Sequence, residues 1–145
     1  MQIISTNSFP DDSLTDLVAK RFTAKQILNA YRECSAYRAL KPLQGYALPL
    51  CYGVYHGDAH DEIFVILEKV SGHTMESALE AHPDDGKARE LRVQATSVLA
   101  AIHQAGYAHG DINPRNFMLL EGGSMVVVDL ENSRYVYIRV ATCTI

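Results

Sequence analysis

The sequence predicts an α+β fold made of small antiparallel sheets and a few helices. Two pairs of apolar runs, 48–55 with 63–70 and 116–120 with 125–130, are each joined by a polar turn, which is typical of β-hairpins. Between the two pairs, residues 87–104 repeat apolar side chains at helical spacing. The 145 residues suffice for one domain of ordinary size or for two small lobes that share a cleft.

The composition is that of a globular protein and argues against several function classes. Hydrophobic residues make up 48% of the chain and charged residues 21%, which argues against disorder. The net charge of -4 and the pI near 5.8 leave no basic field for nucleic acid. No apolar run approaches the roughly 20 residues that span a bilayer, so we expect no membrane association.

The cysteines indicate a reducing compartment. Cys34, Cys51 and Cys143 are odd in number and have no metal-ligand spacing. The N-terminus lacks the positive flank and apolar block of a signal peptide. We therefore expect reduced thiols and a cytoplasmic protein.

The first expected strand is LVAKRF, residues 17–22. Its alternation places Lys20 on one face with Val18 and Phe22, and the other three side chains on the opposite face. The preceding residues, 1–15, are polar and are expected to form a loop.

A helix is expected next, with Thr23 as its N-cap and its end before Pro42. Four side chains at helical spacing form its expected apolar face: Ile27, Tyr31, Cys34 and Tyr37. The first hairpin follows, over residues 48–55 and 63–70.

The second half of the chain begins with a short helix that has Thr74 as its expected cap and is broken at residues 82–86. The long helix over 87–104 has one apolar stripe, formed by Leu91, Ala95, Val98, Leu99 and Ile102. Gly106 is its expected C-cap. After the second hairpin, the tail from residue 134 onward is β-prone and carries no motif.

Three oxygen-bearing side chains stand around the second hairpin. Asp111 and Asn116 fit the spacing D-x-x-x-x-N, and Asp129 ends a run of three valines. A carboxylate at the exit of an apolar strand must meet water, a cation or hydrogen-bond donors, because an unpaired buried charge is too costly. Oxygen ligands of this kind suit Mg²⁺, which is usually shared with substrate phosphates.

Phosphoryl transfer requires this set of groups. The metal neutralises charge on the phosphates, an Asp orients or accepts the proton of the attacking hydroxyl, and an Asn helps to hold a second metal ion. A lysine grips the α- and β-phosphates and is oriented by a glutamate on a helix. Lys20 on the first strand and Glu33 on the first helix offer both groups.

Taken in order, these segments resemble the protein-kinase-like superfamily. LVAKRF is similar to the strand with the phosphate-binding lysine, and YRECSAY to the helix with the paired glutamate. FVILEKVSG resembles the strand and hinge beside the adenine, HGDINPRN the catalytic loop, and VVVDLE the metal-binding segment. The resemblance covers residues 17–133 or so, and its five motifs stand in the family's order.

The resemblance implies ATP and Mg²⁺ as cofactors, and it implies two groups of site residues. Around the adenine, Leu67 takes the place of the gating residue, and Glu68 and Val70 supply backbone hydrogen bonds. Around the phosphates, the catalytic base is Asp111, the metal ligands are Asn116 and Asp129, and the phosphate anchor is Lys20 with Glu33.

Two departures from protein kinases concern the substrate. His109-Gly110-Asp111 stands where those enzymes carry His-Arg-Asp, so the arginine that contacts a phosphorylated activation loop is missing. Asp129-Leu130-Glu131 replaces Asp-Phe-Gly. Both are similar to the aminoglycoside and choline kinase branch, which phosphorylates small molecules, whereas NPRN keeps the proline of the protein-kinase loop. The expected acceptor is therefore a hydroxyl of either a small molecule or a protein Ser/Thr.

Other departures predict a truncated, two-lobed kinase-like fold. No G-x-G-x-x-G precedes Lys20, and the fourteen residues after Glu131 are too few for the later helices of the large lobe. We expect residues 1–70 to form a small lobe with an antiparallel sheet and one helix. Residues 71–145 are expected to form a reduced, mostly helical lobe with the catalytic hairpin.

The missing helices and the missing glycine-rich loop motivate an alternative function. Those helices normally cover the long helix, so Leu91, Val98 and Ile102 are expected to be partly exposed. In this alternative the chain is a catalytically inactive, pseudokinase-like fragment or interaction module. It would bind a protein partner or a second copy of itself through the uncovered helix.

Simpler interpretations exist for single residues. Asp111 could cap a turn, Lys20 could protect an edge strand from aggregation, and Glu33 could face solvent and pair with an arginine. Glu131 could be a further ligand of metal or water, or could simply be exposed. A metal-dependent hydrolase built on Asp111, Asp129 and His109 is a further class. It explains the loop but leaves Lys20, Glu33 and the hinge without a role, and we expect His109 to be structural.

Overall fold

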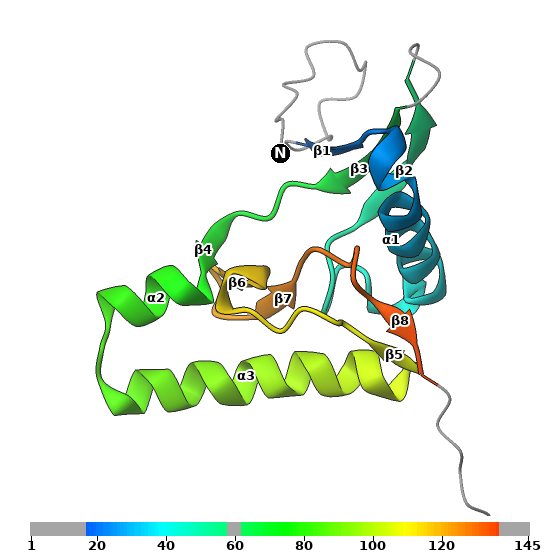
Figure 1. Ribbon diagram of the computed structural model, residues 1–145. Helices are drawn as coiled ribbons and strands as arrows, with labels where there is room; N and C mark the ends of the chain where they lie inside the picture. Colours follow the sequence, from blue (N-terminus) through cyan, green and yellow to red (C-terminus); the bar gives the residue numbers. More distant parts are fainter. Residues whose placement is uncertain (1–16, 58–61, 137–145) are drawn as a thin grey trace, which may run out of the picture.

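The computed structural model describes residues 17–57 and 62–136, and the expectations for the N-terminal loop, for residues 58–61 and for the tail beyond residue 136 lie outside these ranges. Within them the chain forms two small antiparallel sheets, a two-stranded ribbon and three α-helices (Figure 1). This architecture confirms the predicted α+β class. The elements are β1 (Leu17–Phe22), η1 (Ala24–Gln26), α1 (Ile27–Ala39), η2 (Lys41–Leu43), β2 (Cys51–His56), β3 (Ile63–Glu68), β4 (Gly72–Thr74), α2 (Met75–Ala81), α3 (Asp85–Gln104), β5 (Tyr107–Ala108), η3 (Pro114–Asn116), β6 (Phe117–Leu120), β7 (Met125–Val127) and β8 (Arg134–Tyr135).

The first sheet has the order β1-β3-β2, and its neighbouring strands are antiparallel. Lys20 of β1 lies opposite Val65 of the central strand. The expected alternation of β1 holds only in its second half, because Leu17, Val18 and Ala19 are all buried. Helix α1 packs against β1 and β3, and this contact brings it over Lys20.

Helix α1 buries a different face from the one expected. Ile27 and Tyr31, two members of the predicted apolar face, are exposed. The buried face is formed by Ala30, Glu33, Ala36 and Tyr37. A charged residue at the centre of the buried face explains why the apolar pattern of this helix was misleading. Thr23 also caps the short 3-10 turn η1 rather than α1 itself.

The second sheet has the order β4-β6-β7 and contains the second predicted hairpin. Phe117 of β6 pairs with Val127 of β7. Strand β4 runs along the other edge of β6, where a β-carbon at Gly72 would lie 2.1 Å from the Leu119 carbonyl oxygen. Strand β7 ends at Val127, earlier than the sequence predicted, so Asp129 stands outside the sheet.

The apolar stripe of α3 is mostly buried, so the expected partial exposure is wrong for Leu91 and Ile102 and holds for Val98. Leu91 and Ile102 are both 0% exposed, and Val98 is half-buried. Helix α3 packs against β7 and β5, and Figure 1 shows it running below the second sheet. Strands β7 and β5 thus cover most of the stripe, and Leu91 and Ile102 offer no exposed surface for self-association.

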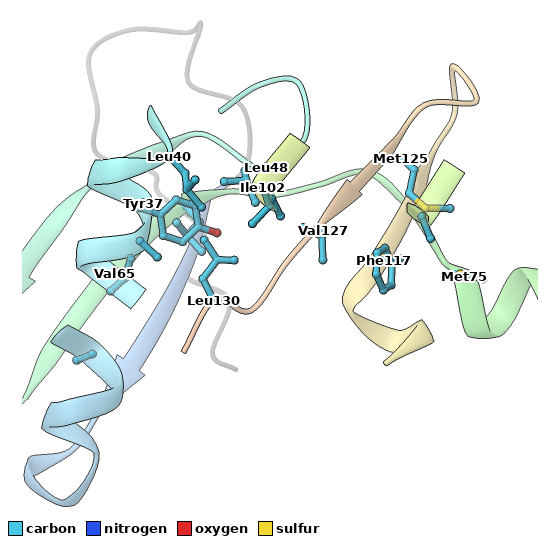
Figure 2. Close-up of a cluster of buried hydrophobic side chains, with 14 of the residues drawn as sticks. Tyr37, Leu40, Leu48, Val65, Met75, Ile102, Phe117, Met125, Val127 and Leu130 are labelled. Carbon is cyan, nitrogen blue, oxygen red and sulfur yellow. The ribbon is translucent and has the colours of Figure 1, made fainter. Parts of the chain in front are cut away.

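One hydrophobic core connects the two sheets. Buried residues of β1, α1, β3, α3 and β7 belong to a single cluster. Figure 2 shows part of it, with Tyr37 of α1, Leu130 from the segment after β7, and Ile102 of α3. A continuous core of this kind fixes the position of one sheet relative to the other.

Two helix caps follow the prediction. The Ser77 N–H donates to Thr74 Oγ1 at 3.1 Å, so Thr74 caps α2. Gly106 follows α3 with φ +82, the left-handed conformation that glycine adopts readily after a helix. Among the helices in the described ranges, none has the length and apolar character needed to cross a membrane.

Candidate active site

The Lys20 ammonium group lies at the centre of three carboxylates. Its Nζ atom is 2.8 Å from Glu33 Oε2, 2.5 Å from Asp129 Oδ1 and 3.3 Å from Glu131 Oε2. The four side chains come from β1, α1 and the segment after β7. The fold therefore brings together three predicted site residues and adds Glu131, for which the sequence had left a ligand role and simple exposure as open alternatives.

Glu33 has no exposed side-chain surface, so the interpretation as a solvent-facing residue is wrong. Burial raises the pKa of Glu33, and the attraction of Lys20 lowers it only in part. For Lys20, burial alone lowers the pKa, but attraction to Glu33 and Asp129 outweighs burial and raises the pKa overall. Each charge thus depends on the other, because neither group is fully hydrated.

Asp129 is placed by an unusual backbone conformation. Its φ is +66, and no other non-glycine residue in the described ranges has a positive φ. Aspartate tolerates this left-handed region better than most residues, and such outliers concentrate at functional sites. The turn ends the strand and leaves the Asp129 carboxylate beside Lys20, with 34% of its side chain exposed.

Asp111 is oriented by Asn116. The Asn116 Nδ2 group donates to the backbone carbonyl and to Oδ2 of Asp111, each at 3.1 Å. Because Nδ2 serves Asp111, the Oδ1 atom remains as the acceptor of Asn116. The cap of the adjoining turn is Asn113, whose Oδ1 accepts from the Arg115 N–H at 3.0 Å. The interpretation of Asp111 as a mere turn cap therefore does not hold.

Hydrogen bonds tie the 109–116 loop to the segment that carries Asp129. The Val128 N–H donates to the Asn116 carbonyl at 2.8 Å, and His109 Nε2 is 2.9 Å from the Val128 carbonyl oxygen. The Asp111 N–H donates to His109 Nδ1 at 3.3 Å, so Nε2 carries the ring proton. His109 is buried, as expected of a structural histidine. With both ring nitrogens engaged, it is not available for the hydrolase alternative.

A cavity of about 300 Å³ opens beside the Lys20 cluster. Val18 and Leu67 line it from the first sheet, and Met118 lines it from the second. Val128 and Asp129 complete the wall nearest the carboxylates. Its lining is mostly apolar and includes a few charged groups, which is the usual character of a small-molecule site.

The last residue of β3 and the two residues that follow it, 68–70, border the same cavity. The Glu68 N–H donates to the Leu50 carbonyl at 2.9 Å, and the Glu68 carboxylate accepts from the Leu50 N–H at 3.0 Å. A backbone hydrogen bond between Glu68 and a ligand would therefore have to use the Glu68 carbonyl oxygen as the acceptor. Val70 lies two residues beyond β3 and also lines the cavity.

Oxygen donors for a divalent cation are present here. Glu33, Asp129 and Glu131 offer carboxylate oxygens within 4.8 Å of one another, and Asn116 offers Oδ1. Hard oxygen donors of this kind fit Mg²⁺. With all groups ionised, three negative charges and the one positive charge of Lys20 sum to -2, which favours a divalent cation.

Glu131 could have been found from its spacing. It lies two residues after Asp129, and the intervening Leu130 is fully buried. In an extended strand, such as the one expected over residues 125–130, alternate side chains point to the same side. The sequence pattern carboxylate–apolar–carboxylate therefore indicated that Asp129 and Glu131 share a side of the chain.

Comparison with known proteins identifies the relatives of this chain. A model of the lipopolysaccharide kinase (Kdo/WaaP) family matches residues 16–139. CBL-interacting protein kinase 22 of Oryza sativa subsp. japonica is 35% identical over 77 residues, which are 50% of this chain and 17% of that protein. Serine/threonine-protein kinase cds1 of Schizosaccharomyces pombe is 25% identical over 100 residues, 68% of this chain and 21% of that protein. The chain thus spans about a fifth of these two relatives.

Proposed function

Because the chain belongs to the lipopolysaccharide kinase (Kdo/WaaP) family, we propose that it binds ATP with Mg²⁺ and transfers the γ-phosphate to a hydroxyl group. The observation that carries the proposal is the contact of Lys20 with both Glu33 and Asp129, beside a cavity. The similarity to protein kinases supports phosphotransfer in general.

The adenine base is assigned to the cavity between the sheets. Residues 1–70 and 71–145 are proposed as the two lobes, because Leu67 on one side and Met118 on the other both line this space. A volume of about 300 Å³ suits a flat heterocyclic base. The backbone of Glu68 and Val70 is proposed to hydrogen-bond to its edge.

The phosphates are assigned to the Lys20 end of the cavity. Lys20 would bind the α- and β-phosphates, and Glu33 would orient it from α1. A fully buried carboxylate suits this role, because it holds the ammonium group in one position. Removing either partner is therefore expected to weaken phosphate binding.

The metal is assigned to Asn116 and Asp129. Bound Mg²⁺ neutralises charge on the phosphates. The chain's own contribution is to fix the two ligands relative to each other, since the Val128 N–H bonds to the Asn116 carbonyl one residue before Asp129. This hydrogen bond supports the assignment, because it ties the backbone of Asn116 to the residue that precedes Asp129.

Asp111 is proposed as the catalytic base. The hydrogen bond from Asn116 fixes the Asp111 carboxylate through Oδ2 and leaves Oδ1 to meet the acceptor. The Asp111 N–H is held in turn by His109. The carboxylate would orient the attacking hydroxyl and accept its proton as the bond to the γ-phosphorus forms.

A sugar hydroxyl is the acceptor that we favour. The family that matches the chain is named after lipopolysaccharide, a molecule rich in sugar hydroxyls. The His109-Gly110-Asp111 and Asp129-Leu130-Glu131 segments also resemble those of small-molecule kinases. A protein serine or threonine is the second class to test, in view of the similarity to serine/threonine kinases.

Calorimetry of nucleotide binding tests the proposal. The wild type should bind ATP in the presence of Mg²⁺, and Asp129→Ala should reduce this affinity at least about tenfold, or ~1.4 kcal/mol. Asp85→Ala, on the exposed first turn of α3, is the matched control and should bind like the wild type. Absence of metal-dependent binding by the wild type would contradict the proposal.

A transfer assay separates the proposal from the inactive alternative. Labelled γ-phosphate should move to a sugar hydroxyl or to a protein hydroxyl, and Asp111→Asn should abolish transfer while nucleotide still binds. Nucleotide binding without transfer to any acceptor or to water would favour the pseudokinase-like module. The burial of Leu91 and Ile102 argues only against self-association through α3, which that alternative had predicted.

A further inference from the structure

We propose that Glu131 makes the site selective for metal-bound nucleotide by opposing the binding of metal-free triphosphate. This inference rests on the proposed function, because it requires the phosphates to bind at Lys20. It gives a specificity role to a side chain that belongs neither to the proposed phosphate anchor nor to the proposed metal ligands.

Lys20 is already surrounded by carboxylates. Its Nζ atom donates to Asp129 and forms ion pairs with Glu33 and Glu131. A phosphate oxygen that approaches Lys20 must therefore compete with these carboxylates for its N–H donors. Glu131 makes the longest of the three contacts, at 3.3 Å, and its side chain is 26% exposed. Glu33 in contrast is fully buried and has nowhere to move.

The charge of the cluster opposes a free triphosphate. Lys20, Glu33, Asp129 and Glu131 sum to -2 when ionised, so together they repel the phosphates. A divalent cation that arrives with the phosphates offsets this surplus. Glu33 orients Lys20, and Asp129 is a proposed metal ligand. The charge of Glu131 is therefore the one that can be removed while both of those functions remain.

The backbone that carries Glu131 is anchored on both sides. The Ser133 N–H and hydroxyl both donate to the Leu130 carbonyl, at 3.0 and 2.6 Å. Leu130 is fully buried and Ser133 is nearly so, which fixes the turn around Glu131. The Glu131 carboxylate thus faces Lys20 from a well-anchored turn. Its negative charge therefore stays beside the proposed phosphate position.

The proposal is tested by measuring ATP affinity twice, with excess Mg²⁺ and with EDTA, for four proteins. Beside the wild type, Glu131→Gln removes the charge at nearly constant size, and Glu131→Asp keeps the charge. Glu80→Gln, on the exposed side of α2, is the matched control for loss of one negative charge. The readout is the ratio of the two affinities, which a general loss of stability would leave unchanged.

We expect Glu131→Gln to bind metal-free ATP about tenfold more tightly than the wild type, which corresponds to ~1.4 kcal/mol. Its affinity for ATP with Mg²⁺ should change by less than about threefold. Glu131→Asp should retain most of the discrimination, and Glu80→Gln should match the wild type. Inorganic tripolyphosphate should show the same pattern as ATP, because the effect lies at the phosphates and not at the base.

Unchanged or weaker binding of metal-free ATP by Glu131→Gln would overturn the inference. If the wild type binds ATP with Mg²⁺ in that experiment, the inference alone fails and the proposed function stands. If the wild type binds no nucleotide under either condition, the proposed function fails first and the inference falls with it. The two failures are therefore distinguished by the wild-type measurement with Mg²⁺.

Discussion

Gly110 lies so close to Asn132 that a β-carbon at residue 110 would stand 2.1 Å from the Asn132 carbonyl oxygen. Gly110 also has φ +83, a conformation that residues with side chains rarely adopt. The segment after Asp129 thus crosses directly over the 109–116 loop. The arginine that protein kinases carry at this position has no room here, which gives a physical reason for the glycine between His109 and Asp111.

Gly110→Ala should therefore destabilise the protein by more than the cost of placing a side chain in a left-handed backbone conformation. Gly123→Ala is the matched control, because Gly123 has φ +82 but a β-carbon added there would meet nothing within 4 Å. We expect the control to cost about 1 kcal/mol and Gly110→Ala to cost about 3 kcal/mol. Urea denaturation of the two variants measures this difference. Equal costs would mean that the close approach to Asn132 relaxes easily.

Lys20→Met should destabilise the fold even though it removes no large apolar contact. The substitution leaves the Glu33 carboxylate fully buried without its counter-ion, which costs about 3 kcal/mol. Adding Glu33→Gln should recover most of this loss, because the buried charge is then gone. Arg21→Met is the control on the same strand, where the exposed pair with Glu62 contributes about 0.5 kcal/mol. Additive losses in a double-mutant cycle would contradict the coupling.

The burial of the α3 stripe has a direct test. Leu91→Ala should cost about 3 kcal/mol, since Leu91 is fully buried and its removal leaves a cavity. Val93→Ala, two residues along the same helix, should cost about 0.5 kcal/mol or less, because Val93 is 64% exposed. Thermal and urea denaturation provide both values. A small effect at Leu91 would restore the uncovered helix that the sequence had suggested.

The sequence predicted the parts of this fold that depend on local pattern. The hairpins, the long helix and the caps at Thr74 and Gly106 follow from periodicity and turn residues. The order of the site segments was also evident, because Lys20, Glu33 and Asp129 each stand in a recognisable setting. Their convergence required only that the chain fold as its resemblance implied.

The errors arose where distant segments decide the outcome. The face that α1 buries is set by Lys20 on strand β1. A charged residue at the centre of that buried face carries no apolar signal in the sequence. The cover of α3 comes in large part from β7, which lies beyond it along the chain. The left-handed turn at Asp129 is likewise imposed by hydrogen bonds of its neighbours, such as the one between Val128 and Asn116.

Tyr37 offers a prediction in which removing a polar group improves the core. It is 1% exposed, and its hydroxyl has no hydrogen-bond partner among the described residues. Tyr37→Phe should therefore leave the free energy of unfolding at pH 7 unchanged or raise it by up to about 1 kcal/mol. Tyr46→Phe, at a residue that is 70% exposed, serves as the control and should have little effect. Destabilisation by Tyr37→Phe at pH 7 would show that the hydroxyl is satisfied in solution.

The Tyr37→Phe variant also tests how the buried Tyr37 hydroxyl affects the free energy of unfolding at alkaline pH. Burial raises the pKa of Tyr37 well above its ordinary value of 10.0, and the nearby Glu33 carboxylate raises it further. With the pKa raised in the folded state, the contribution to stability is fully present below about pH 10. It is lost at higher pH, because the unfolded chain ionises first. Tyr37→Phe should thus lose less stability than the wild type between about pH 9 and pH 12, as urea titrations at each pH would measure. Parallel curves for the two proteins would mean that the Tyr37 hydroxyl ionises as easily in the folded chain as in the unfolded one.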